Sequence, residues 1–146
     1  MSPLTVIPDA EVLIGGWLRT HPDIMALDAR VAPRTPDSTS KPWIRVTVID
    51  DGDSTVGHDH LIEYMVQLDC YAGNTAMAAH TAQAEASLLY RTARAVLKAK
   101  EGMQVDSVVV TSVECRGTRV PDTSAEPARE RFIATATVMA HAVSGA

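Results

Sequence analysis

The chain has 146 residues, of which 46% are hydrophobic and 21% charged, and its formal net charge at pH 7 is −5. This length and balance are typical of a single globular domain, and a domain of this size can fold without disulfides or a structural metal. The acidic charge argues against a module that binds nucleic acid through a basic face, because such a face needs cations to neutralise phosphates.

The first predicted helix covers residues 9–20. Asp9 is a favourable N-cap, and Glu11 places negative charge in the first turn, where the helix dipole favours it. Gly15 and Gly16 weaken this helix, which suggests either close approach to a neighbouring backbone or a helix held mainly by tertiary contacts. The apolar stripe of the helix consists of Ala10, Leu13, Ile14, Trp17 and Leu18.

Three strands are expected after the helix, which ends at His21–Pro22. A short strand is predicted over residues 27–32, and a proline-bounded loop follows over 33–42. Alternation of polar and apolar residues predicts strands over 43–50 and 62–71. Because their connection, 51–60, is polar and contains glycine, we expect an antiparallel hairpin with one solvated face.

A long alanine-rich helix is the clearest element of the second half. Asn74 or Thr75 caps its start, and Gly102 stops it after two lysines in the last turn. Its small side chains would let it lie close to a sheet. The predicted buried face consists of Ala78, Ala82, Ala86, Leu89, Ala93, Val96 and Leu97.

The last two predicted strands cover residues 107–115 and 131–141, and the segment between them, 116–129, is expected to be a loop. The predicted fold is therefore α+β: one domain, 1–146, with an antiparallel sheet of four to five strands and two helices packed mainly on one face. The element order is α-β-β-β-α-β-β, with long loops at about 33–42, 51–60 and 116–129. The other face of the sheet would be polar and open unless a partner covers it.

The stretch VIDDGDSTVGHDH, residues 48–60, looks like a metal site because it gathers aspartates and histidines. The weak candidates are Asp51, Asp53, His58 and His60. The spacing fails for a calcium loop, since counting from Asp51 puts Val56 at position six and Ile62 at position twelve. A catalytic zinc on His58 and His60 would need a third protein ligand, which Asp50, Asp51 or His141 would supply only by accident of the fold. We therefore expect a polar turn, with no metal and no cofactor.

No catalytic constellation is expected either. The sequence has no G-x-S-x-G elbow, P-loop or G-x-G-x-x-G fingerprint. Cys70 falls on the apolar side of its strand, where a thiol is usually a small core residue. Cys70 and Cys115 form no CxxC pair, and no secretory signal or membrane span is predicted, so free thiols in a cytoplasmic chain are expected.

Charged residues on the predicted loops are candidates for contacts between subunits. Arg116, Arg119 and Arg129 flank or lie within the segment 116–129. If that segment orders against another copy, these arginines are plausible partners for the acidic hairpin connection. The candidates on or next to that connection are Asp50, Asp51, Asp53, His58 and Asp59.

The chain resembles the tail-terminator (tail-completion) proteins of phages, of the type found in actinobacteriophages and prophages. The resemblance lies in the element order, in VLIGGWLRTHP followed by an Arg-Val strand, and in a long helix that opens with YAGNTAMAAHTAQAEASLL. It covers nearly the whole chain, as pattern and order rather than as an invariant motif. The matching positions are Leu68, Asp69, Tyr71, Gly73, Asn74, Ala78, Ala82, Ala86 and Leu89.

The resemblance implies a structural virion protein rather than an enzyme. Such proteins form a six-fold ring that caps the end of the tail tube, stops tube polymerisation and presents a docking surface to the head. The implied partners are other copies of the chain, the tail tube protein and the head–tail connector or neck proteins. Double-stranded DNA would pass through the lumen without specific binding, and no membrane is involved. The implied location is the tail or neck of the virion, assembled in the host cytoplasm.

Three alternatives remain open from the sequence. The chain could be another neck protein, namely a head-closure or adaptor component. It could be a small metal-dependent enzyme that uses the Asp/His stretch 51–60. It could also be a cellular binding module without a phage role.

Overall fold

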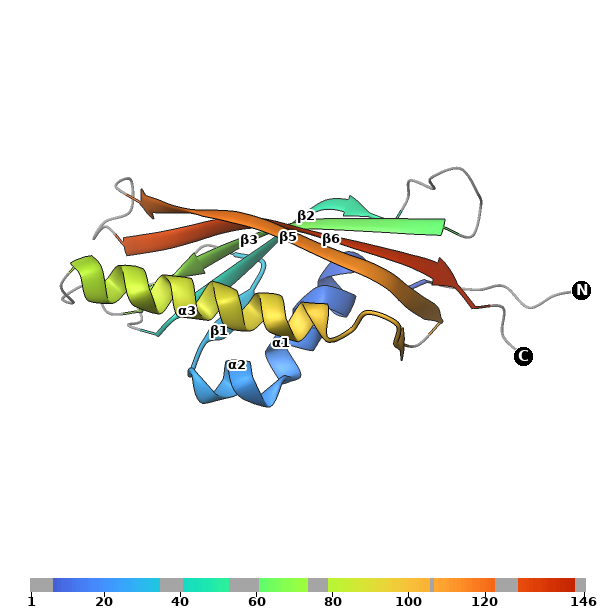
Figure 1. The fold of residues 1–146 in the computed structure, drawn as a ribbon, viewed down its shortest axis with the longest axis horizontal. Helices are drawn as coiled ribbons and strands as arrows, with labels where there is room; N and C mark the ends of the chain where they lie inside the picture. The colour runs from blue at the N-terminus through green and yellow to red at the C-terminus, as the bar shows by residue number, and fades with distance from the viewer. Residues whose placement is uncertain are drawn as a thin grey trace, which may run out of the picture.

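The computed structural model describes residues 7–34, 41–52, 61–73, 79–105, 107–122 and 129–143. Its centre is one curled six-stranded sheet with the strand order β1-β2-β3-β6-β5-β4 (Figure 1). β1 pairs with β2 in parallel, and every other neighbouring pair is antiparallel. The strands are β1 (Arg30–Ala32), β2 (Trp43–Asp51), β3 (Leu61–Tyr71), β4 (Gln104–Val105), β5 (Val108–Asp122) and β6 (Arg129–Ala142).

The helices lie on one side of this sheet (Figure 1). The long helix α3 (Ala79–Lys98) packs against β6, β5 and β3, and the short N-terminal helices pack beside it. The α+β class and the one-sided placement of the helices are confirmed. None of the described helices is both long and apolar enough to cross a membrane. The N-terminal elements are η1 (Glu11–Gly15), α1 (Gly16–Thr20) and α2 (Pro22–Ala26).

The first predicted helix is present, and its opening turn is a π-helix. The Asp9 carboxylate accepts a hydrogen bond from the Val12 backbone N–H at 2.7 Å, as expected of a cap. Gly15 lies beneath the ion pair of Glu11 and Arg19, and a Cβ there would come within 2.9 Å of both side chains. The close approach at this glycine is therefore to side chains, not to a neighbouring backbone. All five residues of the predicted apolar stripe are buried: Ala10, Leu13, Ile14, Trp17 and Leu18.

The prediction of a strand over 27–32 is wrong in its first half. A helix that the sequence analysis missed, α2, begins at Pro22, and the imidazole of His21 accepts the backbone N–H of Asp23. Proline suits the first helical position because its missing N–H has no helical partner there. Leu27 ends α2, and Asp28 turns the chain with a positive φ of 55°. The strand that follows is only three residues long, and its parallel pairing makes the sheet mixed rather than antiparallel.

The prediction of a loop over 116–129 is wrong for residues 116–122 and for Arg129, whereas residues 123–128 lie outside the described residues. β5 continues to Asp122 and β6 begins at Arg129, with Asp122 and Arg129 paired in the ladder. Glycine and proline disfavour strands, but backbone pairing with β6 overrides the local preferences of Gly117 and Pro121. A proline is tolerated at 121 because, among the described residues, no strand pairs with that part of β5 on the side away from β6. With the missed β4, the sheet has six strands rather than four or five.

The core lies between the sheet and the helices. The predicted hairpin is confirmed, with Ile44 opposite Cys70 and Val46 opposite Leu68. The described positions of the predicted α3 face are buried, and Gly102 follows that helix with a φ of +80°. Residues 74–78, with the predicted caps and Ala78, lie outside the described residues. The inward side chains of β3 and β6 are Ile62, Tyr64, Val66, Leu68, Cys70, Phe132, Ala134, Ala136, Val138 and Ala140.

Candidate functional site

The residues predicted to form subunit contacts lie towards opposite edges of the sheet. Asp50 and Asp51 end β2, whereas Arg116 and Arg119 belong to β5, with β3 and β6 between these strands. The structure therefore does not bring the two sets together within one chain. Arg129 begins β6, and the side chains of Arg119 and Arg129 are not described. Asp53, His58, Asp59 and His60 lie outside the described residues.

Charge is also separated along the strands. Thr47, Gln67, Thr135 and Arg116 lie in one row across the sheet, and this row divides it into two ends. One end, called the arginine end and counted with this row, holds Arg30, Arg45, Arg116 and Arg131, and the other, acidic end holds Asp50, Asp51, Glu63 and Glu114. Among strand residues with described side chains, the acidic exceptions at the arginine end are Asp69 and Glu130.

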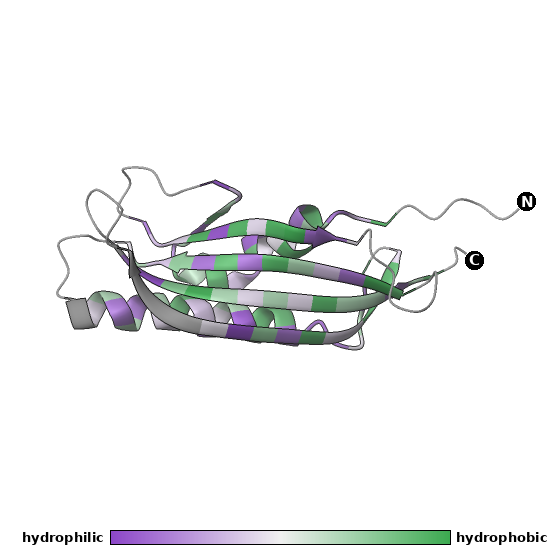
Figure 2. Cartoon of the chain, turned by 90° about the horizontal axis from the view of Figure 1, so that it is seen from above, coloured by the Kyte–Doolittle hydropathy of each residue, from purple (hydrophilic) through white to green (hydrophobic). Residues whose placement is uncertain are grey.

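The face of the sheet away from the helices, here called the helix-free face, has an uncharged middle. Figure 2 looks onto this face and shows the strands in front of the helices, with hydrophilic and hydrophobic residues interspersed. Its central residues are all half-buried rather than sealed in a core. They come from three neighbouring strands and are Thr47, Met65, Gln67, Ile133, Thr135, Thr137 and Met139.

A polar cluster anchors the arginine end of the helix-free face. Asp69 is only 1% exposed, and the Gln67 side-chain amide donates to both of its carboxylate oxygens at 3.2 Å. A guanidinium nitrogen of Arg131 lies 3.8 Å from the same carboxylate. The alternation over residues 62–71 predicts Asp69 on the polar side of its strand, but its burial depends on which strands flank it, and no local pattern reports that. A buried carboxylate with these partners fixes its neighbours in place.

Aromatic rings and arginines extend this cluster along the strand ends. The Trp43 ring is fully buried, and the guanidinium carbons of Arg30 and Arg34 lie 5.6 and 5.9 Å from its centroid. The Trp43 indole N–H donates to the carbonyl oxygen of Arg34 at 3.0 Å. Arg131 lies over Tyr71 in the same manner, at 5.8 Å. These stacked pairs hold the arginines in defined positions while leaving their charge at the end of the sheet.

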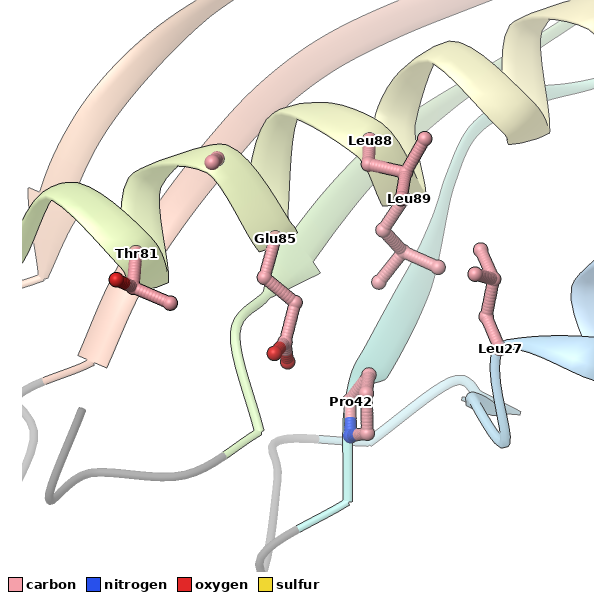
Figure 3. Close-up of a pocket in the computed structure, with 7 residues that line it drawn as sticks. Leu27, Pro42, Thr81, Glu85, Leu88 and Leu89 are labelled. Atoms are coloured by element: carbon pink, nitrogen blue, oxygen red, sulfur yellow. The ribbon is translucent and has the colours of Figure 1, made fainter.

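A groove of about 390 Å³ lies between α3 and the residues that precede β1 and β2. Figure 3 shows Leu88 and Leu89 of α3 on one side and Leu27 and Pro42 on the other. Glu85 is the ionisable residue in its lining, and its carboxylate accepts the Gly73 backbone N–H at 2.6 Å. One carboxylate that already has a backbone partner does not make an acid–base pair. The lining residues are Leu27, Pro42, Thr81, Ala84, Glu85, Leu88 and Leu89.

Neither thiol is activated. Cys70 is fully buried among core residues, and burial raises its pKa far above the ordinary thiol range. Burial also raises the pKa of Cys115, although nearby Arg94 and Lys98 lower it in part. Both cysteines are free, as predicted. A thiol whose pKa is raised holds its proton and is a poor nucleophile at neutral pH.

The described residues show no group of three or more histidine, cysteine, aspartate or glutamate side chains that could hold a metal. Of the four weak candidates, Asp51 is described, and its carboxylate accepts the backbone N–H of Ala10. That contact ties the end of β2 to the start of the first helix. The other candidates, Asp53, His58 and His60, belong to the part of the chain that is not described, so the metal hypothesis stays untested there.

No protein-family model matches the chain, and no curated protein is significantly similar to it.

Proposed function

We propose that this chain is a structural protein of a phage tail, which forms a ring on the end of the tail tube, stops its growth and provides the docking surface for the head connector. The observation that carries the proposal is the pair of unlike edges: β2 ends in two aspartates, and the second half of β5 carries Arg116 and Arg119, with the width of the sheet between them. When one subunit carries two different, complementary surfaces, the first surface of each copy binds the second surface of the next copy. Such contacts close into a ring when the rotation from one copy to the next divides a full turn evenly.

The shape of the sheet supports the same proposal. The sheet is curled, and all helices lie on one of its faces (Figure 1). Copies placed side by side would therefore give a wall with helices on one surface and strands on the other. The element order observed, with short N-terminal helices, three strands, a long helix and the final strands, also agrees with the resemblance to tail terminators.

The helix-free face suits passage of DNA without capture. Its centre, on β2, β3 and β6, carries threonine, glutamine, isoleucine and methionine, and Arg116 of β5 is the described cation in the central row. Sequence-independent binding to DNA depends on cations that neutralise phosphates, so a wall with few cations at its centre in an acidic protein offers little affinity. We place this face towards the lumen of the proposed ring, with α3 outside.

Electron micrographs of the purified protein, alone and mixed with a tail-tube protein that polymerises in vitro, test the proposal. The expected result is a ring of six copies with a central channel, together with tubes that stop growing when the protein is added. Tubes that elongate at an unchanged rate and carry no added density at their ends would overturn it. A tail-tube protein incubated with bovine serum albumin controls for nonspecific effects on growth.

A further inference from the structure

Among the described residues, the part of β5 beyond Val110 has no strand on its outer side. β4 pairs with β5 only at Val108 and Val109. Further along, the Val113 N–H donates to the Glu101 carboxylate at 2.9 Å, so it points away from β6. Because backbone direction alternates along a strand, the N–H groups of Cys115 and Gly117 point the same way. Among the described residues, this part of the edge has no pairing strand.

Gly117 makes this edge accessible. It is exposed, and a Cβ there would come within 2.6 Å of the Phe132 ring and 2.9 Å of the Ala134 methyl group. The close approach of β6 therefore requires a glycine, and Gly117 is itself exposed at this edge. Long unpaired edges of this kind are ready to pair with another strand.

The second unpaired edge belongs to β2. β1 covers β2 only from Trp43 to Arg45, so the later part of β2 has no strand on that side in the described residues. Val48 and Ile49 lie in this part and are 39% and 55% exposed. Apolar side chains next to an unpaired edge gain burial when a further strand is added.

We propose that copies of this chain join by antiparallel pairing of the β5 edge of one copy with the β2 edge of the next, staggered so that Arg116 lies opposite Asp50. The inference rests on the proposed ring, because it names the surface that closes it. Three successive antiparallel pairings separate β2 from β5, so these strands run in opposite directions. A rotation about an axis parallel to the strands does not change strand direction. The β5 edge of one copy and the β2 edge of the next copy therefore also run in opposite directions, and they pair as antiparallel strands.

Charge sets the stagger. Within one sheet, Asp50 lies in the same row as Glu114. Pairing neighbouring copies without a shift would therefore place two carboxylates opposite each other, which is unfavourable. A shift of two residues, about 7 Å along the strand, brings Arg116 opposite Asp50 on the same face. Closing a sheet into a barrel requires a stagger of this kind.

The first test removes one N–H from the β5 edge. Cys115→Pro deletes an outward donor and leaves the ladder to β6 intact, whereas the matched control Cys115→Ser keeps the donor. Both variants are checked for folding by circular dichroism and thermal unfolding, and their mass is measured by sedimentation and electron microscopy, with and without tail tubes. We expect rings from wild type and Cys115→Ser, and monomers from Cys115→Pro. A folded Cys115→Pro variant that still forms rings would overturn the pairing and leave the ring function standing.

The second test measures the register between β5 of one copy and β2 of the next. It does not require the proline variant to fold. Arg116→Glu is expected to weaken association roughly tenfold or more, and adding Asp50→Arg to it should restore assembly. Glu114→Arg is the control, because it strengthens association only if pairing occurs without a shift. Failure of the double variant to recover, with a gain from Glu114→Arg, would overturn the proposed stagger.

Two further results distinguish a failure of the β5–β2 pairing from a failure of the proposed ring function. A dimer that Cys115→Pro abolishes but Asp50→Arg leaves unchanged would indicate pairing of two β5 edges with each other, and would overturn the proposal. A wild-type chain that forms no ring in solution or on tail tubes would overturn both the pairing and the proposed function.

Discussion

The two faces of the sheet are built from the same strands but differ in residue type and in burial. The face covered by helices carries aliphatic and alanine side chains that are almost entirely buried, such as Leu68, Ala136 and Val138. The helix-free face carries threonine, glutamine, methionine and charged residues at intermediate exposure. Adjacent residues of one strand therefore experience different surroundings, because successive side chains point to opposite faces.

The two faces therefore differ in what they contribute to folding and to contacts with other molecules. Burial of apolar area on the covered face supplies the main driving force for folding. The helix-free face and the edges contribute less to folding, so they are open to contacts with other copies or with DNA. The exception is the cluster around Asp69, which is buried although it lies on the helix-free face.

The largest predicted effect compares two residues of β3. Leu68→Ala removes a fully buried side chain from the covered face and should lower the free energy of unfolding by about 3 kcal/mol. Met65→Ala, on the helix-free face, should cost the monomer less than about 1 kcal/mol. Urea unfolding of both variants at low protein concentration measures the difference. Equal costs would break the distinction between the two faces.

Asp69→Ala tests the buried exception. The change leaves the Gln67 amide and the Arg131 guanidinium without their shared acceptor. We expect a loss of about 2 kcal/mol, moderated because the Arg131 side chain is 23% exposed and therefore partly screened by solvent. Glu63→Ala, on the same face of the same strand, is the control. If both variants unfold at the same denaturant concentration, the cluster does not stabilise the fold.

Tyr64→Phe tests a hydrogen bond at the rim of the covered face. The Tyr64 hydroxyl donates to the Pro8 carbonyl oxygen at 2.7 Å, and its loss should cost about 1 kcal/mol. Burial, with Asp51 and Asp9 nearby, raises the pKa of Tyr64 from 10.0 to about 12. The neutral phenol is therefore favoured in the folded state, and wild type should lose stability as pH rises through 10 to 12. Thermal unfolding across this range should show a smaller alkaline loss for Tyr64→Phe.

Glu101→Gln should have the smallest effect. Hydrogen bonds from the Lys98 side chain and the Val113 backbone N–H lower the pKa of this carboxyl below 4.5. A lowered folded-state pKa stabilises the fold above the ordinary value and loses that effect as the carboxyl is protonated. Wild type should therefore lose more stability than the variant when pH falls below 4.5. Parallel acid titrations of the two proteins would contradict this.

Several elements could be predicted because their signals are local. The stripe from Ala10 to Leu18 has helical spacing, and residues 62–71 alternate as a half-buried strand does, so the buried positions follow from the period. α2 was missed because one turn is too short to show a period. The strand character of 116–122 was missed because it depends on pairing with β6, which no local pattern reports.

In the candidate site, too, residue types could be read from the sequence, whereas the positions of these residues depend on strand order. The sequence identified Asp50, Asp51 and Arg116 as charged residues suited to contacts, but not their places on opposite sides of the sheet. The burial of Asp69 and the unpaired edge at Cys115 and Gly117 could not be read from composition. Both depend on which strands are neighbours, and strand order is a long-range property.

By itself, the sequence determined the α+β class, the buried faces of the first and last helices, and the hairpin of β2 and β3, since residue spacing within an element decides which side turns inward. Tertiary structure alone decided the strand order, the parallel β1, the full length of β5 and the two edges left without a pairing strand among the described residues. These features arise from hydrogen bonds between segments far apart in the chain, and such bonds leave no periodic signal in either segment alone.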